Sequence, residues 1–266
     1  SMIADAAAGA DKVKIRPDAK FSSRDIDILE VHEAWVHVGT TLNGGKQPWC
    51  SWLSKGSPRV TATQEGLAVM MEIFTFRSYP VRAKRINDRI LGISWAEQGA
   101  DACEVAERFR VMGHTPDEIR YNVGRIFRGT DGTGGAPFTK DLAYARGFVE
   151  YYNFIRTAIG SGRMQMIPLL FCGKLTLDDI PALHELQQQE ILEFPAYLPP
   201  QFADLNGLGV ANPRHRQNWN EDITIARHSA GASTNRCTRR SSSTSAATNS
   251  GDWHSGTGSS RSGCSA

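Results

Sequence analysis

The chain has 266 residues, of which 40% are hydrophobic and 22% charged, and its formal net charge at pH 7 is +2. A chain of this length can bury a substantial core, and it contains no apolar stretch long enough to cross a bilayer. The positive charge lies in the tail, because residues 213–266 contain seven arginines and three acidic residues, whereas the remainder has a net charge of −2. We therefore expect neither a membrane nor a nucleic acid as a partner of the folded part.

Composition divides the sequence into three segments. Residues 1–11 are expected to be a cloning scar and a flexible lead-in, residues 12–209 a folded domain, and residues 210–266 a disordered tail rich in Ser, Thr and Gly. The five cysteines are scattered and show no C-x-x-C spacing; they are Cys50, Cys103, Cys172, Cys237 and Cys264. This pattern indicates free thiols and a reducing, cytoplasmic location rather than a disulfide framework.

The folded part begins with a predicted strand followed by a helix. Residues 13–15 alternate apolar and basic side chains, as an edge strand does. Ser22, with Asp25 three residues later, resembles a capping box and predicts a helix start. Gly39 and the run Asn43-Gly44-Gly45 are expected to stop this helix.

This first helix carries a His-Glu pair and a second histidine five positions after the first: His32, Glu33 and His37. In zinc peptidases with an H-E-x-x-H motif the histidines lie four apart, on one face of a helix. At about 100° per residue, positions five apart in a regular α-helix diverge by about 140°. A π-bulge would absorb the extra residue, and such bulges occur mostly at functional sites. The spacing therefore predicts a local widening of the helix at Ala34–Val36.

A second helix is predicted to begin near Thr61 or Thr63, after a Gly-Ser-Pro turn, and to end near residue 78. Glu65 would lie in its first turn or two. Glu72, seven residues later, points from nearly the same side of the helix and is a reserve candidate for a ligand or for the partner of a ligand.

These two helices together are predicted to supply the side chains of a catalytic zinc site. Zinc that performs hydrolysis usually takes three ligands from His, Glu or Asp, keeps one position for water, and has a nearby carboxylate to move the proton of that water. His32, His37 and Glu65 are the candidate ligands, and Glu33 is the candidate base.

The middle of the chain is predicted to be helical, and β-branched alternating runs are scarce. Thr115 and Pro116 form an N-cap and N1 pair that opens one of these helices. The other predicted helices cover residues 83–94, 101–112, 140–158 and 177–192. We therefore predict a predominantly helical α+β fold.

The glycine-rich run at residues 129–135 is interpreted as a plain connection, because it lacks the G-K-[ST] of a P-loop and follows a helix rather than a strand. Arg128 and Lys140 flank this loop, and either could hold the terminal carboxylate of a peptide substrate. Tyr144, one turn after Lys140, could donate a hydrogen bond to the oxyanion that forms when water attacks a carbonyl.

Several motifs resemble a known family. The run VHEAWVHVGTTLN at residues 31–43, the pentapeptide QEGLA at 64–68, and Phe138-Thr139-Lys140-Asp141 with Tyr144 and Gly147 resemble the bacterial proteins labelled flavohemoglobin expression-modulating QEGLA motif. The resemblance covers roughly residues 13–208 and includes LLFCGK at 169–174 and YLPPQFADLN at 197–206. That family is similar to the eukaryotic microtubule-associated tyrosine carboxypeptidases, whose site uses an HExxxH helix and a downstream Glu.

The resemblance implies a zincin-like metallopeptidase domain at residues 12–209 that binds Zn2+ and releases residues from the C-terminus of a peptide or protein. It implies His32, His37 and Glu65 as ligands and Glu33 as the catalytic carboxylate. Two alternatives stay open at this point. The protein could be a non-catalytic, metal-binding regulatory protein, or a metallopeptidase of the endo or amino type.

Overall fold

The computed structural model of the chain describes residues 6–205. The strands are β1 (Ala6–Ala8) and β2 (Val13–Ile15). The helices are α1 (Ser23–Leu29), the π-helix η1 (Glu30–Val38), α2 (Gly39–Lys46), α3 (Thr61–Phe74), α4 (Pro80–Glu97), α5 (Ala102–Val111), α6 (Pro116–Ile126), α7 (Leu142–Gly160), α8 (Ile180–Gln188) and α9 (Pro200–Ala203). Short 3-10 turns lie at η2 (Ser51–Ser54), η3 (Pro58–Val60), η4 (Thr139–Asp141), η5 (Met164–Phe171) and η6 (Leu177–Asp179). The described part is therefore mostly helical with one small sheet, which agrees with the predicted α+β class.

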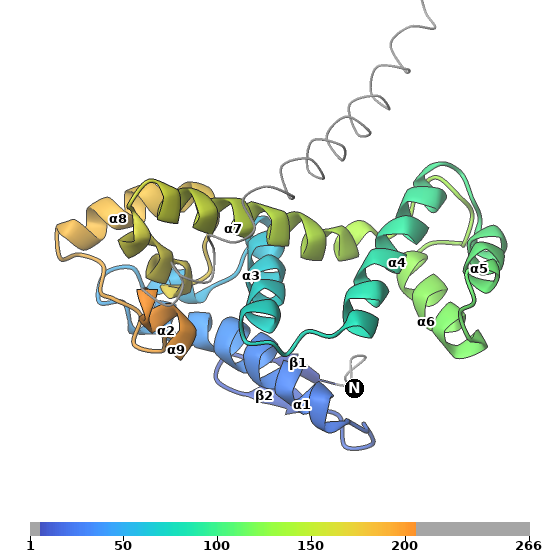
Figure 1. Cartoon of the computed structure of the whole chain (residues 1–266), viewed down its shortest axis with the longest axis horizontal. Helices are drawn as coiled ribbons and strands as arrows, with labels where there is room; N and C mark the ends of the chain where they lie inside the picture. The colour runs from blue at the N-terminus through green and yellow to red at the C-terminus, as the bar shows by residue number, and fades with distance from the viewer. Residues whose placement is uncertain (1–5, 206–266) are drawn as a thin grey trace, which may run out of the picture. The chain divides into compact units, whose positions relative to one another are not determined.

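A two-stranded antiparallel sheet stands at the N-terminal end, beside α1 (Figure 1). Strand β2 was predicted, and it pairs with β1 in the register Ala7 to Lys14. Strand β1 lies within the segment expected to be a flexible lead-in, so that expectation is corrected for Ala6–Ala8. Three alanines carry no strand pattern, and only the pairing with β2 and the contact with η1 define this strand.

The predicted helix start and the predicted widening are both present. Ser22 caps α1 in a capping box with Asp25. The chain then widens into the π-helix η1, which spans nine residues and so extends beyond the predicted Ala34–Val36.

The predicted stop at Gly39 and residues 43–45 is wrong, because the helix continues through these positions as α2. Gly44 serves packing instead of termination. A Cβ on Gly44 would overlap the backbone of Leu53, so a side chain at this position would push η2 away from α2. Helix α2 ends at Lys46.

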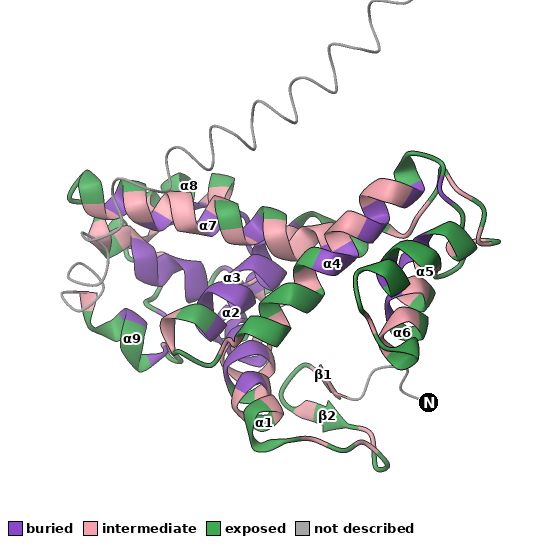
Figure 2. Cartoon of the chain, turned by 45° about the vertical axis from the view of Figure 1, so that its right-hand side comes forward, coloured by how far each residue is buried: buried purple, intermediate pink, exposed green. Residues whose placement is uncertain are grey.

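Helices α3 and α7 cross in direct contact at a pair of glycines and form the centre of the main core (Figure 1). A Cβ on Gly66 would overlap the backbone of Gly147, and a Cβ on Gly147 would overlap the carbonyl of Ala62. Buried residues gather along α3 and α2 in Figure 2. The core around them includes Leu67, Met70, Tyr151 and Ile155, together with most of η5.

Helices α4, α5 and α6 form a second, smaller core around Ile93, Phe109 and Ile126. Thr115 is the N-cap of α6 and Pro116 its first residue, as predicted. The helix predicted over residues 83–94 is longer in the structure, where α4 spans Pro80–Glu97. The glycine-rich run at 129–135 is an irregular connection between α6 and η4, as expected.

The C-terminal part of the described chain wraps back onto the main core. Turn η5 was not predicted, and it buries Ile167, Leu169, Leu170 and Phe171 although Pro168 interrupts it. Helix α8 covers the middle of the predicted 177–192 helix. Within residues 6–205, no helix combines the length and apolar character needed to cross a membrane. The predicted disordered tail at 210–266 lies outside the described residues.

Candidate metal centre

The π-helix η1 brings His32 and His37 to the same face, as the spacing argument requires. Their ring centroids are 5.0 Å apart and the ring planes meet at 77°. A regular α-helix would separate these positions by about 140° around its axis, so the widened turn is the feature that makes a shared site possible. His32 is almost fully buried and His37 is partly exposed.

Helix α3 contributes the third donor. The Oε2 atom of Glu65 lies 3.4 Å from Nε2 of His32 and 3.6 Å from Nε2 of His37. Glu65 stands one residue before Gly66, so the close crossing of α3 and α7 at that glycine fixes the position of the carboxylate against the π-helix. Two imidazole nitrogens and one carboxylate oxygen therefore point toward a common space.

Each histidine has its other ring nitrogen occupied by a buried acceptor. Nδ1 of His32 lies 2.7 Å from Oε1 of Glu72, and Nδ1 of His37 lies 3.4 Å from Oε1 of Gln64. An acceptor at Nδ1 holds the proton on that atom and leaves the lone pair of Nε2 free for a ligand. Glu72 is thus placed as the partner of His32, which was one of the two roles expected for it, and Arg82 in turn binds Glu72 with two hydrogen bonds.

Glu33 lies on the same π-helix and forms a close group with the two histidines, a set that differs from His32, His37 and Glu65. One atom from each of His32, Glu33 and His37 lies within 4.8 Å of the others, a grouping that could hold a metal ion. Oε2 of Glu33 also accepts a hydrogen bond of 2.9 Å from the backbone N–H of Ala8 in β1. The N-terminal strand therefore orients the candidate base.

The charges of the cluster are strongly coupled. Burial alone would lower the pKa of His32, but its hydrogen bonds to Glu65 and Glu72 and their negative charges raise that pKa to about 9. Burial opposes the charged form of Glu65, yet hydrogen bonds to the two histidines lower the pKa of this carboxyl well below its usual range. Before a cation binds, a proton on His32 balances the acids, and this proton is what a metal ion would replace.

Two further predicted residues lie beside the cluster. Nζ of Lys140 is 3.6 Å from Oε1 of Glu65, and the Tyr144 ring centroid is 6.3 Å from that of His32. Burial and the nearby carboxylates of Glu65 and Asp141 raise the pKa of Tyr144 well above its usual value. Its hydroxyl therefore stays protonated and can donate a hydrogen bond.

Arg128 is placed differently. It is exposed, and its guanidinium carbon lies 5.8 Å from the centroid of the Phe138 ring. None of the interactions described for it joins it to the histidine cluster. Lys140 thus lies at the site, and Arg128 packs on the loop that precedes η4.

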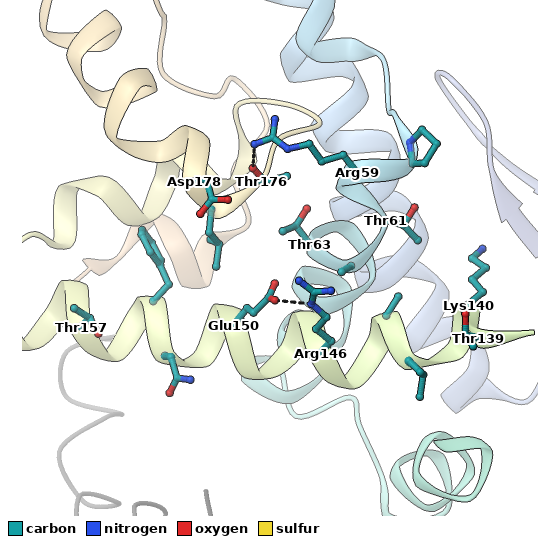
Figure 3. A pocket seen from close by; sticks show the side chains of 17 residues that line it. Arg59, Thr61, Thr63, Thr139, Lys140, Arg146, Glu150, Thr157, Thr176 and Asp178 are labelled. Carbon is teal, nitrogen blue, oxygen red and sulfur yellow. Dashed lines mark hydrogen bonds and ion pairs between the residues drawn. The ribbon is translucent and has the colours of Figure 1, made fainter. Parts of the chain in front are cut away.

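A cavity of about 1060 Å³ adjoins the site at Lys140. It runs along α7 between the start of α3 and η6, with Thr139 and Lys140 at one end and Thr157 toward the other (Figure 3). Arg146 pairs with Glu150 along its wall, and Arg59 binds Thr176 across its rim. Threonine hydroxyls and ion pairs line this cavity together with apolar side chains such as those of Leu142 and Phe154.

Sequence reasoning missed the residues that support the histidines. Gln64 is adjacent to Glu65 in the QEGLA pentapeptide, and Lys174 closes the LLFCGK motif, so both stood in motifs that resembled the family. The contact between Gln64 and His37 spans 27 residues, and the contact between Lys174 and Gln64 spans 110. Contacts between such distant positions cannot be found from spacing along one helix.

Comparison with known families identifies the chain. The model of the family described as microtubule-associated tyrosine carboxypeptidase matches residues 1–217. The chain belongs to this family. Membership indicates a carboxypeptidase-like hydrolase that acts on a peptide or protein. A comparison with curated proteins gave no match, and neither did one with solved structures.

Proposed function

We propose that this protein is a zinc-dependent metallocarboxypeptidase with a zincin-like catalytic domain. The observation that carries the proposal is the convergence of three donor atoms, with Oε2 of Glu65 within 3.4 and 3.6 Å of the histidine Nε2 atoms. The donor set of two imidazoles and one carboxylate is typical of catalytic zinc in peptidases. His32, His37 and Glu65 would hold the ion.

A bound zinc ion would polarise the scissile carbonyl and increase the acidity of a water molecule. Glu33 accepts the proton of the attacking water and then delivers it to the departing amine. The backbone N–H of Ala8 holds one carboxylate oxygen, which leaves the other free for proton transfer. The hydroxyl of Tyr144 donates a hydrogen bond to the oxygen of the attacked carbonyl.

Lys140 is the proposed binding residue for the free terminal carboxylate of the substrate. Its side chain is half exposed and its ammonium lies at the junction of Glu65 and the cavity along α7. A point charge at this place attracts a carboxylate and positions the last peptide bond near the donor atoms. Arg128 has no part in this proposal, since its guanidinium lies over Phe138.

Two other functions are compatible with a metal site but differ from a carboxypeptidase in turnover or in the substrate they need. A regulatory protein would bind metal without turnover, but the presence of Glu33 beside a ligand favours catalysis. An endopeptidase or aminopeptidase would not need the free carboxylate that Lys140 is positioned to bind. We also propose a cytoplasmic location, in line with the free thiols of Cys50, Cys103 and Cys172.

The test combines elemental analysis with peptide cleavage. We expect about one zinc per chain, and release of C-terminal amino acids from peptides with a free carboxylate. N-terminally blocked peptides should be cleaved equally well, whereas C-terminally amidated peptides should resist. Zinc without any amino-acid release from a mixed peptide pool would support the regulatory alternative, and cleavage of amidated peptides would support an endopeptidase.

A further inference from the structure

The side chain of Lys174 reaches the histidine cluster from a part of the chain far along the sequence. Its Nζ atom donates a hydrogen bond of 2.7 Å to the backbone carbonyl of His37 and another of 2.7 Å to Oε1 of Gln64. Lys174 is half-buried, and neither contact is with a surface carboxylate. Lys174 therefore donates to the backbone of His37 and to the side-chain amide of Gln64, and these contacts point to a role at the site rather than to solubility alone.

The contact with the His37 carbonyl lies at the junction between the π-helix η1 and α2. At this junction the backbone N–H of Gly39 is shared between the carbonyls of Ala34 and Val36, so the regular ladder is interrupted. The hydroxyl of Thr41 also donates to the His37 carbonyl, at 2.8 Å. Side-chain donors from Lys174 and Thr41 thus stabilise the backbone where a π-helix returns to an α-helix.

The contact with Gln64 decides the orientation of its amide. Gln64 is only 6% exposed, and its Oε1 accepts from Lys174, from the Thr40 hydroxyl at 3.1 Å, and faces Nδ1 of His37 at 3.4 Å. Nε2 of Gln64 is buried without a partner among the described residues. An ammonium has donors only, so a flipped amide would set N–H groups against Lys174. The lysine therefore keeps the oxygen toward His37.

The backbone of Lys174 is itself held firmly. Its N–H donates to the carbonyl of Leu53 at 2.7 Å, and a Cβ on Gly173 would lie 2.6 Å from the Leu53 side chain. The turn that carries Lys174 is thus packed against η2. This packing fixes the backbone position from which the Lys174 side chain extends.

We propose that Lys174 is a positioning residue for the metal centre. Acting through Gln64, it keeps the proton of His37 on Nδ1, and through the His37 carbonyl it fixes the end of the π-helix, so that Nε2 of His37 stays directed at the ion. This inference rests on the proposed function, because it assigns His37 as a ligand.

The test compares Lys174→Met with Lys84→Met. Lys84 also makes a 2.7 Å contact with its acceptor, Asp88, but it is exposed on α4, the helix that packs with α5 and α6. Zinc affinity is measured by competition with a chromophoric chelator. We expect Lys174→Met to weaken zinc binding about 10- to 100-fold, the range typical for loss of a residue that supports a ligand, and Lys84→Met to leave it unchanged.

A second readout reports the tautomer directly. Nitrogen chemical shifts of His37 in the metal-free protein are expected to show a protonated Nδ1 in the wild type and a mixture of tautomers in Lys174→Met. Lys174→Arg, which keeps a donor, should restore most of the zinc affinity. If Lys174→Met does not fold, Gln64→Leu and Gln64→Glu replace it, and only Gln64→Leu should lose affinity because Glu retains an acceptor.

Failure of this inference differs from failure of the proposed function. If the wild type binds zinc, and Lys174→Met or Gln64→Leu binds it equally well with an unchanged His37 tautomer, Lys174 is not a positioning residue. If the wild type binds no zinc, the proposed function is wrong and the inference falls with it.

Discussion

At the scale of single residues, Glu33 and the histidines are neighbours with separable roles. Glu33 is held by the N–H of Ala8, and in the proposed mechanism it carries the proton while His32 and His37 hold the ion. The two kinds of variant should therefore differ in metal content, although both lose activity.

Glu33→Gln is expected to lower kcat by at least about 100-fold while zinc content stays near that of the wild type, because general acid–base catalysis contributes roughly 10²–10⁴-fold. His32→Ala should lose both zinc and activity. Elemental analysis and peptide turnover on the same preparations provide the measurement. Equal zinc loss in the two variants would show that the roles are wrongly assigned.

The raised pKa of His32, about 9, gives a pH dependence with a definite sign. In the metal-free protein the protonated ring stabilises the fold below its unfolded pKa of about 6.5, and this contribution is lost as pH rises through about 9. Zinc must displace the same proton, so zinc affinity should rise by about tenfold per pH unit from pH 7 to 9 and then level off.

Chelator competition at several pH values measures this dependence. Glu72→Gln is the informative variant, because removal of the Glu72 charge lowers the pKa of His32. In this variant the zinc affinity should therefore rise less steeply with pH below pH 9. A zinc affinity that does not change between pH 7 and 9 in the wild type would contradict the assignment of His32 as a protonated ligand.

At the scale of elements, the crossing of α3 and α7 positions Glu65 and is intolerant of any side chain at Gly66 or Gly147. Gly66→Ala or Gly147→Ala should destabilise the fold by at least about 1–3 kcal/mol, the usual effect of overpacking. Gly124→Ala is the matched control. It is an exposed position within α6 with open space around it, and alanine there should stabilise by about 0.5–1 kcal/mol.

Urea unfolding of the three variants gives the comparison. If Gly66→Ala and Gly147→Ala had the same free energy of unfolding as the wild type, the close helix crossing would be contradicted.

The elements differ in how far the sequence determines them. The N-caps at Ser22 and Thr115 act within one turn, so residue types alone were enough to predict them. The π-helix was predictable because two histidines five residues apart can share one face of a helix only if the helix is widened between them. Gly44 misled the prediction, since a glycine that allows close packing has the same signature as one that ends a helix. Lys174 escaped notice because its partners lie more than 100 residues away.

At the scale of the whole molecule, the candidate metal centre lies where η1 meets α3, a helix of the main core. η1 and α3 contact each other directly, and His32, His37 and Glu65 lie at that contact. A bound ion would therefore stabilise the folded domain as well as the site. At a free zinc concentration 100 times Kd the gain is about 2.7 kcal/mol.

For a domain of this size, that gain corresponds to a rise in Tm of roughly 5–11 °C. We expect a chelator to lower the Tm of the wild type by this amount and to leave the Tm of His37→Ala unchanged. Calorimetry with and without chelator makes the measurement. A wild-type protein that has lost its zinc but keeps the same Tm would show that the ion adds nothing to folding.

In the proposed mechanism, the hydrogen bond from the Ala8 N–H to Glu33 links catalytic turnover to strand β1. A protease that cuts the short turn between β1 and β2 would release this strand, although every donor to the metal would remain in place. Such a nicked protein would retain its zinc but lose the restraint on the carboxylate that shuttles the proton.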